Sequence, residues 1–234
     1  MEYLATFSGF FKNGGPFMYV ILITGVVIIA LVAERFWVIG RAASFNSGKF
    51  TRDLLKRVSR GDIAGAAEWS GRMKAPAAVV AYAILSRNHS DEEKLQNAAD
   101  GAATLVLPRL SRRLPYLSML ANSATLLGLL GTIFGLTMAF SAVGAADPAQ
   151  RSAFLAAGIS QALNTTAFGL IVAVPTLLLH GFLVSKVEAV VEAVDETTVQ
   201  LIKAVTGKSE ARAGKTPDSG EKSKTMQALQ NQGA

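Results

Sequence analysis

The chain has 234 residues, of which half are hydrophobic and 17% are charged, and it contains no cysteine. A soluble globular chain usually has about 25% charged residues, so this composition favours membrane-spanning segments. The lack of cysteine excludes disulfides and thiolate metal sites. The net charge of +6 does not indicate nucleic-acid binding, because the basic residues flank apolar runs and no aromatic-basic RNA motif is present.

The first apolar run covers residues 17–40 and follows a short, weakly polar segment, residues 1–16, that ends in Gly-Gly-Pro. About 20 apolar residues are needed to cross the hydrocarbon core of a membrane, and this run supplies them. We expect no cleavage as a signal peptide, because the run is long and no basic segment precedes it. Glu34, Arg35 and Trp37 end the run. They predict an outward-reaching ion pair at the membrane surface, and the alternative is an intramembrane proton site at Glu34.

A hydrophilic block follows at residues 41–114, with 13 Lys or Arg and 7 Asp or Glu. The positive-inside rule places this block in the cytoplasm and the N-terminus in the periplasm, because the other loop, residues 144–154, carries a single basic residue. The block shows no strand-like alternation, so we expect helices. They cover residues 49–59, 62–69, 75–86 and 90–110. A capping box at Ser90 starts the last one, and Pro108 and Pro115 mark bends.

Two further apolar runs, residues 115–143 and 155–184, are each long enough to span a membrane. Residues 185–206 then show the spacing of an amphipathic cytoplasmic helix. Residues 207–234 are rich in Gly, Lys, Ser and Gln and are expected to form a disordered tail. The sequence therefore predicts an all-α integral membrane protein, with three transmembrane helices and long cytoplasmic helical extensions.

Both later runs carry small residues at helical spacing, and small residues let helix backbones approach closely in lipid. We expect Gly128, Gly131, Gly135 and Gly169 to serve this helix packing, which needs no further function. The expected small face of the second span consists of Ala121, Thr125, Gly128, Thr132, Gly135, Ala139 and Ala142. That of the third span consists of Gly158, Ala162, Thr165 or Thr166, Gly169, Ala173 and Thr176.

Polar side chains accompany these small faces, namely Thr132, Thr165, Thr166 and Gln161. They could act only as hydrogen-bonding partners between helices. Alternatively, several copies in a ring would enclose a lumen lined by the three threonines. No Asp, Glu, Lys or Arg lies inside either run, so a titrating carboxylate for proton transport would have to come from another polypeptide. The chain lacks the nucleotide-binding, hydrolase and zinc motifs of enzymes, so we expect no enzymatic activity, cofactor or metal.

Residues 126–140, LLGLLGTIFGLTMAF, and 159–179, ISQALNTTAFGLIVAVPTLLL, resemble the two signature helices of the ExbB/TolQ/MotA proton-channel family. Three spans resemble ExbB and TolQ, whereas MotA has four. The resemblance implies a homopentamer around a central pore that holds two copies of a single-span ExbD/TolR-type partner with a proton-carrying aspartate. It also implies a bacterial inner-membrane motor, driven by the proton-motive force, that acts on the outer membrane through a TonB-like or TolA-like protein.

In these two stretches, Thr132 and Thr166 correspond to the family's threonines that face the partner aspartate. Thr165 stands where many members have a smaller residue, and Gln161 stands where ExbB and TolQ often have glutamate. Thr125 stands where many members have proline. The resemblance implies an ExbB-type role in protein-mediated outer-membrane transport. A TolQ-like subunit of a Tol-Pal-type system and a non-conducting membrane scaffold remain the alternatives.

Overall fold

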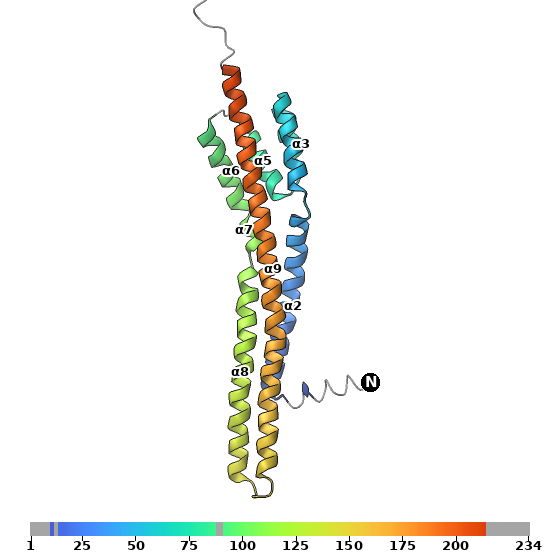
Figure 1. Cartoon of the computed structure of the whole chain (residues 1–234), viewed down its shortest axis with the longest axis vertical. Helices are drawn as coiled ribbons and strands as arrows, with labels where there is room; N and C mark the ends of the chain where they lie inside the picture. The colour runs from blue at the N-terminus through green and yellow to red at the C-terminus, as the bar shows by residue number, and fades with distance from the viewer. Residues whose placement is uncertain (1–9, 12–13, 88–90, 214–234) are drawn as a thin grey trace, which may run out of the picture. The chain divides into compact units, whose positions relative to one another are not determined.

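The protein is described by a computed structural model that covers residues 10–11, 14–87 and 91–213, without the side chains of residues 208–213. The described residues form helices and no strand (Figure 1). The helices in chain order are α2 (Pro16–Ala43), α3 (Ser47–Arg60), α4 (Ile63–Gly71), α5 (Pro76–Leu85), α6 (Glu92–Val106), α7 (Pro108–Ser111), α8 (Leu114–Ala145) and α9 (Arg151–Ala213). Three stretches, within Pro16–Arg60, Glu92–Ala145 and Arg151–Gly207, are long and apolar enough to cross a membrane. The all-α prediction with three long apolar helices is confirmed.

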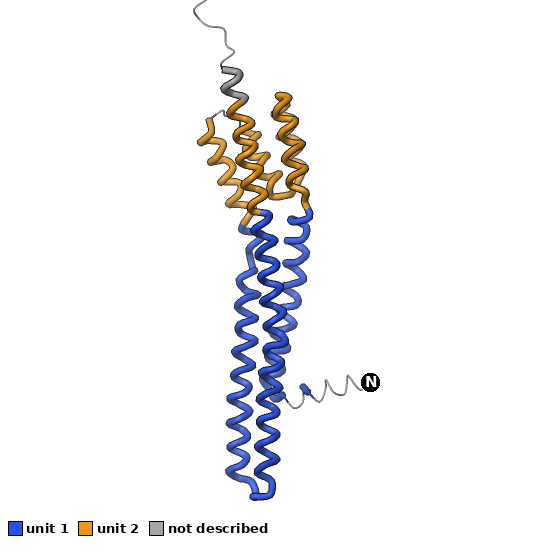
Figure 2. Tube along the Cα trace, viewed as in Figure 1, with its two compact units in different colours: residues 1–44, 108–190 blue, residues 45–107, 191–234 orange. Residues whose placement is uncertain are grey.

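The chain divides into two compact units (Figure 2). The first unit contains residues 1–44 and 108–190, and the second contains residues 45–107 and 191–234. Helix α9 supplies residues to both units. Each unit has its own buried core, so each is described separately.

The first unit contains the apolar helices α2 and α8 and the first part of α9. Helix α2 begins at Pro16, where the missing N–H costs nothing because the first helical turn has no internal acceptor for it. Its buried Met18 and Ile21 pack with Phe168 of α9. Further along the helices, Ala121 and Ala124 of α8 pack against Ala173 of α9. Small side chains at these contacts allow the helix backbones to lie close together.

The second unit is a helical cluster built on α3 to α6 and the last part of α9. The Asn46 side chain caps α3 by accepting from the Lys49 N–H, and Gly61 ends it with a φ of 93°. The fully buried Leu54, Leu95 and Leu201 bring α3, α6 and α9 into one core. Such mutual burial of amphipathic helix faces supplies most of the stability of short helices.

Several element boundaries differ from the sequence prediction. The expected helix over residues 90–110 is interrupted before Pro108, because proline cannot donate the next helical hydrogen bond. Asp91 caps α6 by accepting from the Glu93 N–H. The predicted cap Ser90 lies outside the described residues, as do residues 1–9 and 214–234. Helix α9 passes through residue 185 without interruption and reaches Ala213, inside the segment expected to be a tail.

Candidate functional site

Helices α8 and α9 approach each other backbone to backbone at their glycines. A methyl group added at Gly169 would lie 2.8 Å from the Ala124 carbonyl oxygen and 3.2 Å from the Gly128 Cα. A methyl group at Gly135 would lie 3.1 Å from the backbone nitrogen of Ala162. Both contacts are shorter than ordinary van der Waals distances, so no larger residue fits without moving the two helices apart.

The face of α8 that packs is rotated slightly from the predicted one. Thr125 is exposed and Thr132 is half-buried, although both were expected on the small face. The smaller Ala124 and Gly131 occupy the contact instead, because only the smallest side chains permit this backbone approach. The buried small residues of α8 are Ala121, Ala124, Gly128, Gly131, Gly135 and Ala139. On α9 the predicted face is confirmed, with Gly158, Ala162, Thr165, Gly169, Ala173 and Thr176 all buried.

Thr165 lies in the interior of the folded chain. Its side chain is completely buried and contacts Gly131 of α8. Its Oγ1 lies 2.7 Å from the carbonyl oxygen of Gly14 and 2.8 Å from that of Gln161, and it donates to this pair. We expected Thr165 to face a lumen, but in this structure its hydroxyl links the segment before α2 to α9.

Thr166 and Thr132 lie closer to the surface than Thr165. Thr166 is half-buried, and its Oγ1 donates to the Gly128 carbonyl oxygen at 3.0 Å, which links α9 to α8. Thr132 is also half-buried, and its Oγ1 donates to the Leu129 carbonyl oxygen of its own helix at 2.6 Å. Since Gly128 and Thr132 are four residues apart, they lie one helical turn from each other on α8. The hydroxyls of Thr166 and Thr132 therefore lie beside neighbouring turns of α8.

Gln161 is half-buried on α9, one turn before Thr165, and it contacts Gly15. Gly15 has a φ of 73°, a left-handed conformation that side-chain-bearing residues rarely adopt. A side chain at Gly15 would also collide with the Gln161 amide. Sequence reasoning missed this contribution of Gly14 and Gly15 to the site. The signal was present as the Gly-Gly-Pro sequence, which indicated only a turn.

A second polar cluster lies at the other end of α2. Both Glu34 carboxylate oxygens accept from Arg113 Nη1, at 2.6 and 2.7 Å, and Arg35 Nη2 donates to Glu34 at 2.8 Å. The predicted ion pair at Glu34 is confirmed. The outward orientation expected for the pair is wrong for Arg35, which is only 6% exposed. Its Nη1 donates to the backbone carbonyl oxygens of Arg112, at 2.7 Å, and Arg109, at 3.4 Å.

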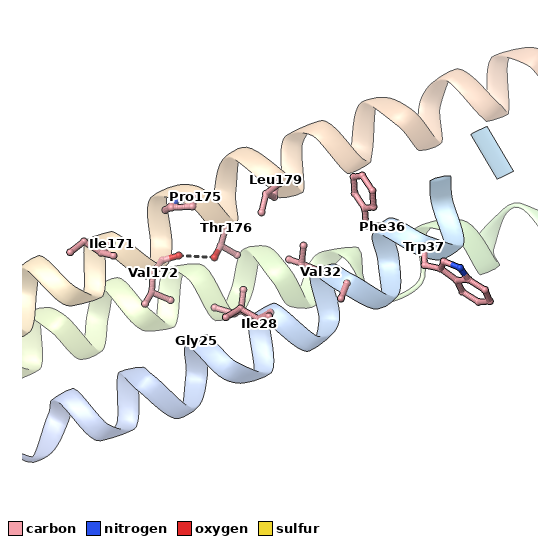
Figure 3. A pocket seen from close by; sticks show the side chains of 12 residues that line it. Gly25, Ile28, Val32, Phe36, Trp37, Ile171, Val172, Pro175, Thr176 and Leu179 are labelled. Carbon is pink, nitrogen blue, oxygen red and sulfur yellow. Dashed lines mark hydrogen bonds between the residues drawn. The ribbon is translucent and has the colours of Figure 1, made fainter. Parts of the chain in front are cut away.

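An apolar groove of about 680 Å³ runs between α2 and α9 (Figure 3). Gly25 and Phe36 of α2 line it opposite Pro175 and Thr176 of α9. Pro175 has no N–H to donate along the helix, while the Thr176 hydroxyl donates to the Val172 carbonyl oxygen at 2.6 Å. Among the residues that the structure describes, those lining the groove carry no titratable side chain.

Comparison with known proteins gives the family. The MotA/TolQ/ExbB proton channel family matches residues 72–196. The chain is 30% identical to the ExbB-like 1 biopolymer transport protein of Synechocystis sp. over 178 residues, which cover 75% of this chain and 69% of that protein. It is 23% identical to an ExbB homolog of Methanothermobacter thermautotrophicus over 207 residues, 88% of this chain and 71% of that protein. With the Tol-Pal system protein TolQ of Haemophilus influenzae it shares 34% identity over 104 residues, 43% of this chain and 45% of that protein.

In these matches, the described part of the chain is helical and includes three membrane-spanning candidates, two of which pack through small residues and threonines. The chain therefore belongs to the MotA/TolQ/ExbB proton channel family, as a multi-pass membrane subunit of the ExbB/TolQ type.

Proposed function

We propose that this chain is the inner-membrane channel subunit of an ExbB–ExbD-type motor. In this proposal five copies surround a central pore that holds a dimer of a single-span ExbD/TolR-like partner. The proton-motive force moves protons through the pore and drives rotation of the partner dimer. A TonB-like protein carries the resulting work to outer-membrane transport. The chain itself has no enzymatic activity and needs no cofactor.

One observation carries this proposal: two adjoining helices bear hydroxyl groups and have no charged residue along their apolar stretches. Helix α8 contains no Asp, Glu, Lys or Arg, and α9 contains none between Arg151 and Lys186. An ionised carboxylate at membrane depth costs about 2.5–3.5 kcal/mol on insertion scales, so chains avoid carrying it without need. A proton-carrying aspartate would therefore come from the partner helix, and this chain would supply its hydrogen-bonding surroundings.

Thr132 and Thr166 are the hydroxyls that we propose face the pore. Each is half-buried in the single protomer and bonded to one backbone carbonyl, so its oxygen retains accepting capacity for water or a protonated carboxyl. Thr165 donates to the Gly14 carbonyl oxygen and Gln161 contacts Gly15, so both residues position the segment that precedes α2. Gly128, Gly131, Gly135 and Gly169 keep the two helix backbones close enough for this arrangement.

The proposed topology follows from the charge distribution. The N-terminus, residues 1–16, and the loop at residues 144–154 are placed in the periplasm. Residues 41–114, the α9 segment 185–206 and the tail from residue 207 are placed in the cytoplasm. The basic residues of the 41–114 block support this orientation, because Lys and Arg beside membrane spans stay on the cytoplasmic side.

The test removes both hydroxyls and measures proton-dependent work. We expect Thr132→Ala with Thr166→Ala to assemble normally with the partner and to abolish proton flux in reconstituted vesicles. The double serine variant, which keeps both hydroxyls, should retain flux. Thr137→Ala is the matched control, because Thr137 is an exposed threonine of α8 that bonds only to its own helix. Full flux in the double alanine variant would disprove the assignment of the two threonines.

A TolQ-like role in a Tol-Pal-type system is the second candidate, and the Haemophilus influenzae TolQ match favours it. The two roles differ in the protein that receives the work, so co-purification with the neighbouring single-span protein and with TonB-like or TolA-like proteins separates them. A non-conducting scaffold would form the same helix contacts but show no proton flux in any variant.

A further inference from the structure

Three arginines gather where α7 meets α8. Arg109, Arg112 and Arg113 are all exposed, and together with Ser111 and Tyr116 they line a shallow pocket of about 560 Å³. No acidic side chain belongs to the lining in the part of the chain that the structure describes. The pocket is therefore a concentrated positive site with hydroxyl groups beside it.

The backbone of this pocket is held from inside the protein by Arg35. The Arg35 side chain is 7% exposed, and its Nη1 donates to the carbonyl oxygens of Arg112 and Arg109. Both residues therefore have their backbones fixed while their own side chains remain exposed. A site whose backbone is already ordered loses less conformational entropy when it binds a ligand.

Two of the positive charges have no acidic partner. Arg113 pairs with Glu34 at 2.6 Å, and Arg35 pairs with the same carboxylate at 2.8 Å. The ion pairs among the described residues leave Arg109 and Arg112 without a carboxylate. Arginine is suited to phosphate because its planar guanidinium offers two parallel donors.

The pocket lies where an apolar helix begins. Helix α8 starts at Leu114, and Tyr116 is 57% exposed. Exposed aromatic side chains at the end of a membrane span mark the level of the lipid headgroups. Beyond Tyr116, α8 exposes several large apolar side chains, among them Met119 and Leu126 at 63% and 65% exposure. The arginines thus lie at the level of the lipid headgroups, and the adjoining apolar surface of α8 can contact acyl chains.

We propose that this pocket binds the headgroup of an anionic phospholipid, with its phosphate between Arg109 and Arg112. The hydroxyls of Ser111 and Tyr116 are placed to bond the rest of the headgroup. The two unpaired cations favour anionic lipids, and basic pockets beside membrane helices are a known setting for such binding. The adjoining apolar surface favours a lipid over an acidic protein segment, because an acidic segment has no acyl chains to contact that surface.

The test compares lipid affinities of the full-length chain in mild detergent by native mass spectrometry. We expect phosphatidylglycerol to bind more tightly than phosphatidylcholine. The double variant Arg109→Gln with Arg112→Gln should bind phosphatidylglycerol about 25-fold more weakly, since each basic residue near the surface contributes about a factor of five. Phosphatidylcholine affinity should not change. Arg60→Gln with Arg87→Gln is the matched control, because it removes two exposed arginines outside the pocket.

Four results would overturn the proposal. They are a wild-type chain without preference for phosphatidylglycerol, an equal loss in the control variant, full competition by inorganic phosphate, and full competition by an acidic peptide. If the glutamine variant does not fold, the wild-type preference and its partial retention in Arg109→Lys with Arg112→Lys decide the matter, because lysine keeps both charges but lacks the two parallel donors of the guanidinium. Complete loss of the preference in that folded lysine variant would overturn recognition of the lipid by charge.

Discussion

Replacing Gly169 by alanine tests whether the α8–α9 contact depends on backbone approach. Ordinary contact with a Cβ begins near 3.4 Å, whereas a Cβ at Gly169 would lie 2.8 Å from the Ala124 carbonyl oxygen. The neighbour is backbone rather than the end of a flexible side chain. Helices α8 and α9 would therefore have to separate by about 0.6 Å at this point.

The expected cost follows from two opposing effects. Overpacking a close contact costs about 1–3 kcal/mol. Alanine in place of glycine offsets up to about 1 kcal/mol of this, because it restricts the unfolded chain and favours the helix. We expect Gly169→Ala to lower the free energy of unfolding by about 1–2 kcal/mol. The loss should also weaken the hydrogen bond from Thr166 to Gly128, which joins the same two helices.

The matched control is Gly181→Ala on the same helix, where an added Cβ would meet nothing within 4 Å. It should leave stability unchanged or raise it by up to about 1 kcal/mol. Reversible unfolding of the purified chain in mixed micelles, followed by tryptophan fluorescence and circular dichroism, gives both values. If Gly169→Ala proves as stable as Gly181→Ala, the close approach of α8 and α9 at Gly169 is refuted.

Two further predictions concern the buried polar contacts. Arg35→Gln should destabilise the protein by about 3 kcal/mol, because it removes the donor from the backbone carbonyls of Arg109 and Arg112. Thermal unfolding beside the exposed-site variant Arg52→Gln measures this, and equal melting temperatures would contradict it. In the second unit, Thr51 Oγ1 and Thr197 Oγ1 lie 2.8 Å apart. A double-mutant cycle with valine at both positions should give a coupling free energy of about 1 kcal/mol, and additive effects would show that the bond contributes nothing.

The helices and the apolar spans could be predicted because they depend on local pattern. Runs of apolar residues such as 17–40 identify the spans by length alone. The face of α8 was harder to predict, because two series of steps of three and four share most of their positions. One series includes Thr125 and Thr132, and the other includes Ala124 and Gly131. Periodicity does not distinguish the two series. The series with the smaller side chains forms the contact, because it allows the backbones of α8 and α9 to approach most closely.

The contacts that sequence reasoning missed involve backbone acceptors far away along the chain. Thr165 donates to the Gly14 carbonyl oxygen, 151 positions earlier. Arg35 donates to carbonyl oxygens 74 and 77 positions later. Every residue carries a carbonyl, so no residue type marks which one will accept such a bond. Only the tertiary arrangement determines these partners.

The long-range bonds of Arg35 join segments that the ribosome makes at different times. The ribosome makes α2 before residues 108–113, so the guanidinium is present in the nascent chain when the turn between α7 and α8 emerges. The carbonyls of Arg109 and Arg112 can then be satisfied as soon as α8 lies beside α2. A fragment that begins after α2 would lack this donor. Completion of the turn before the second span therefore depends on a donor that the first span supplies.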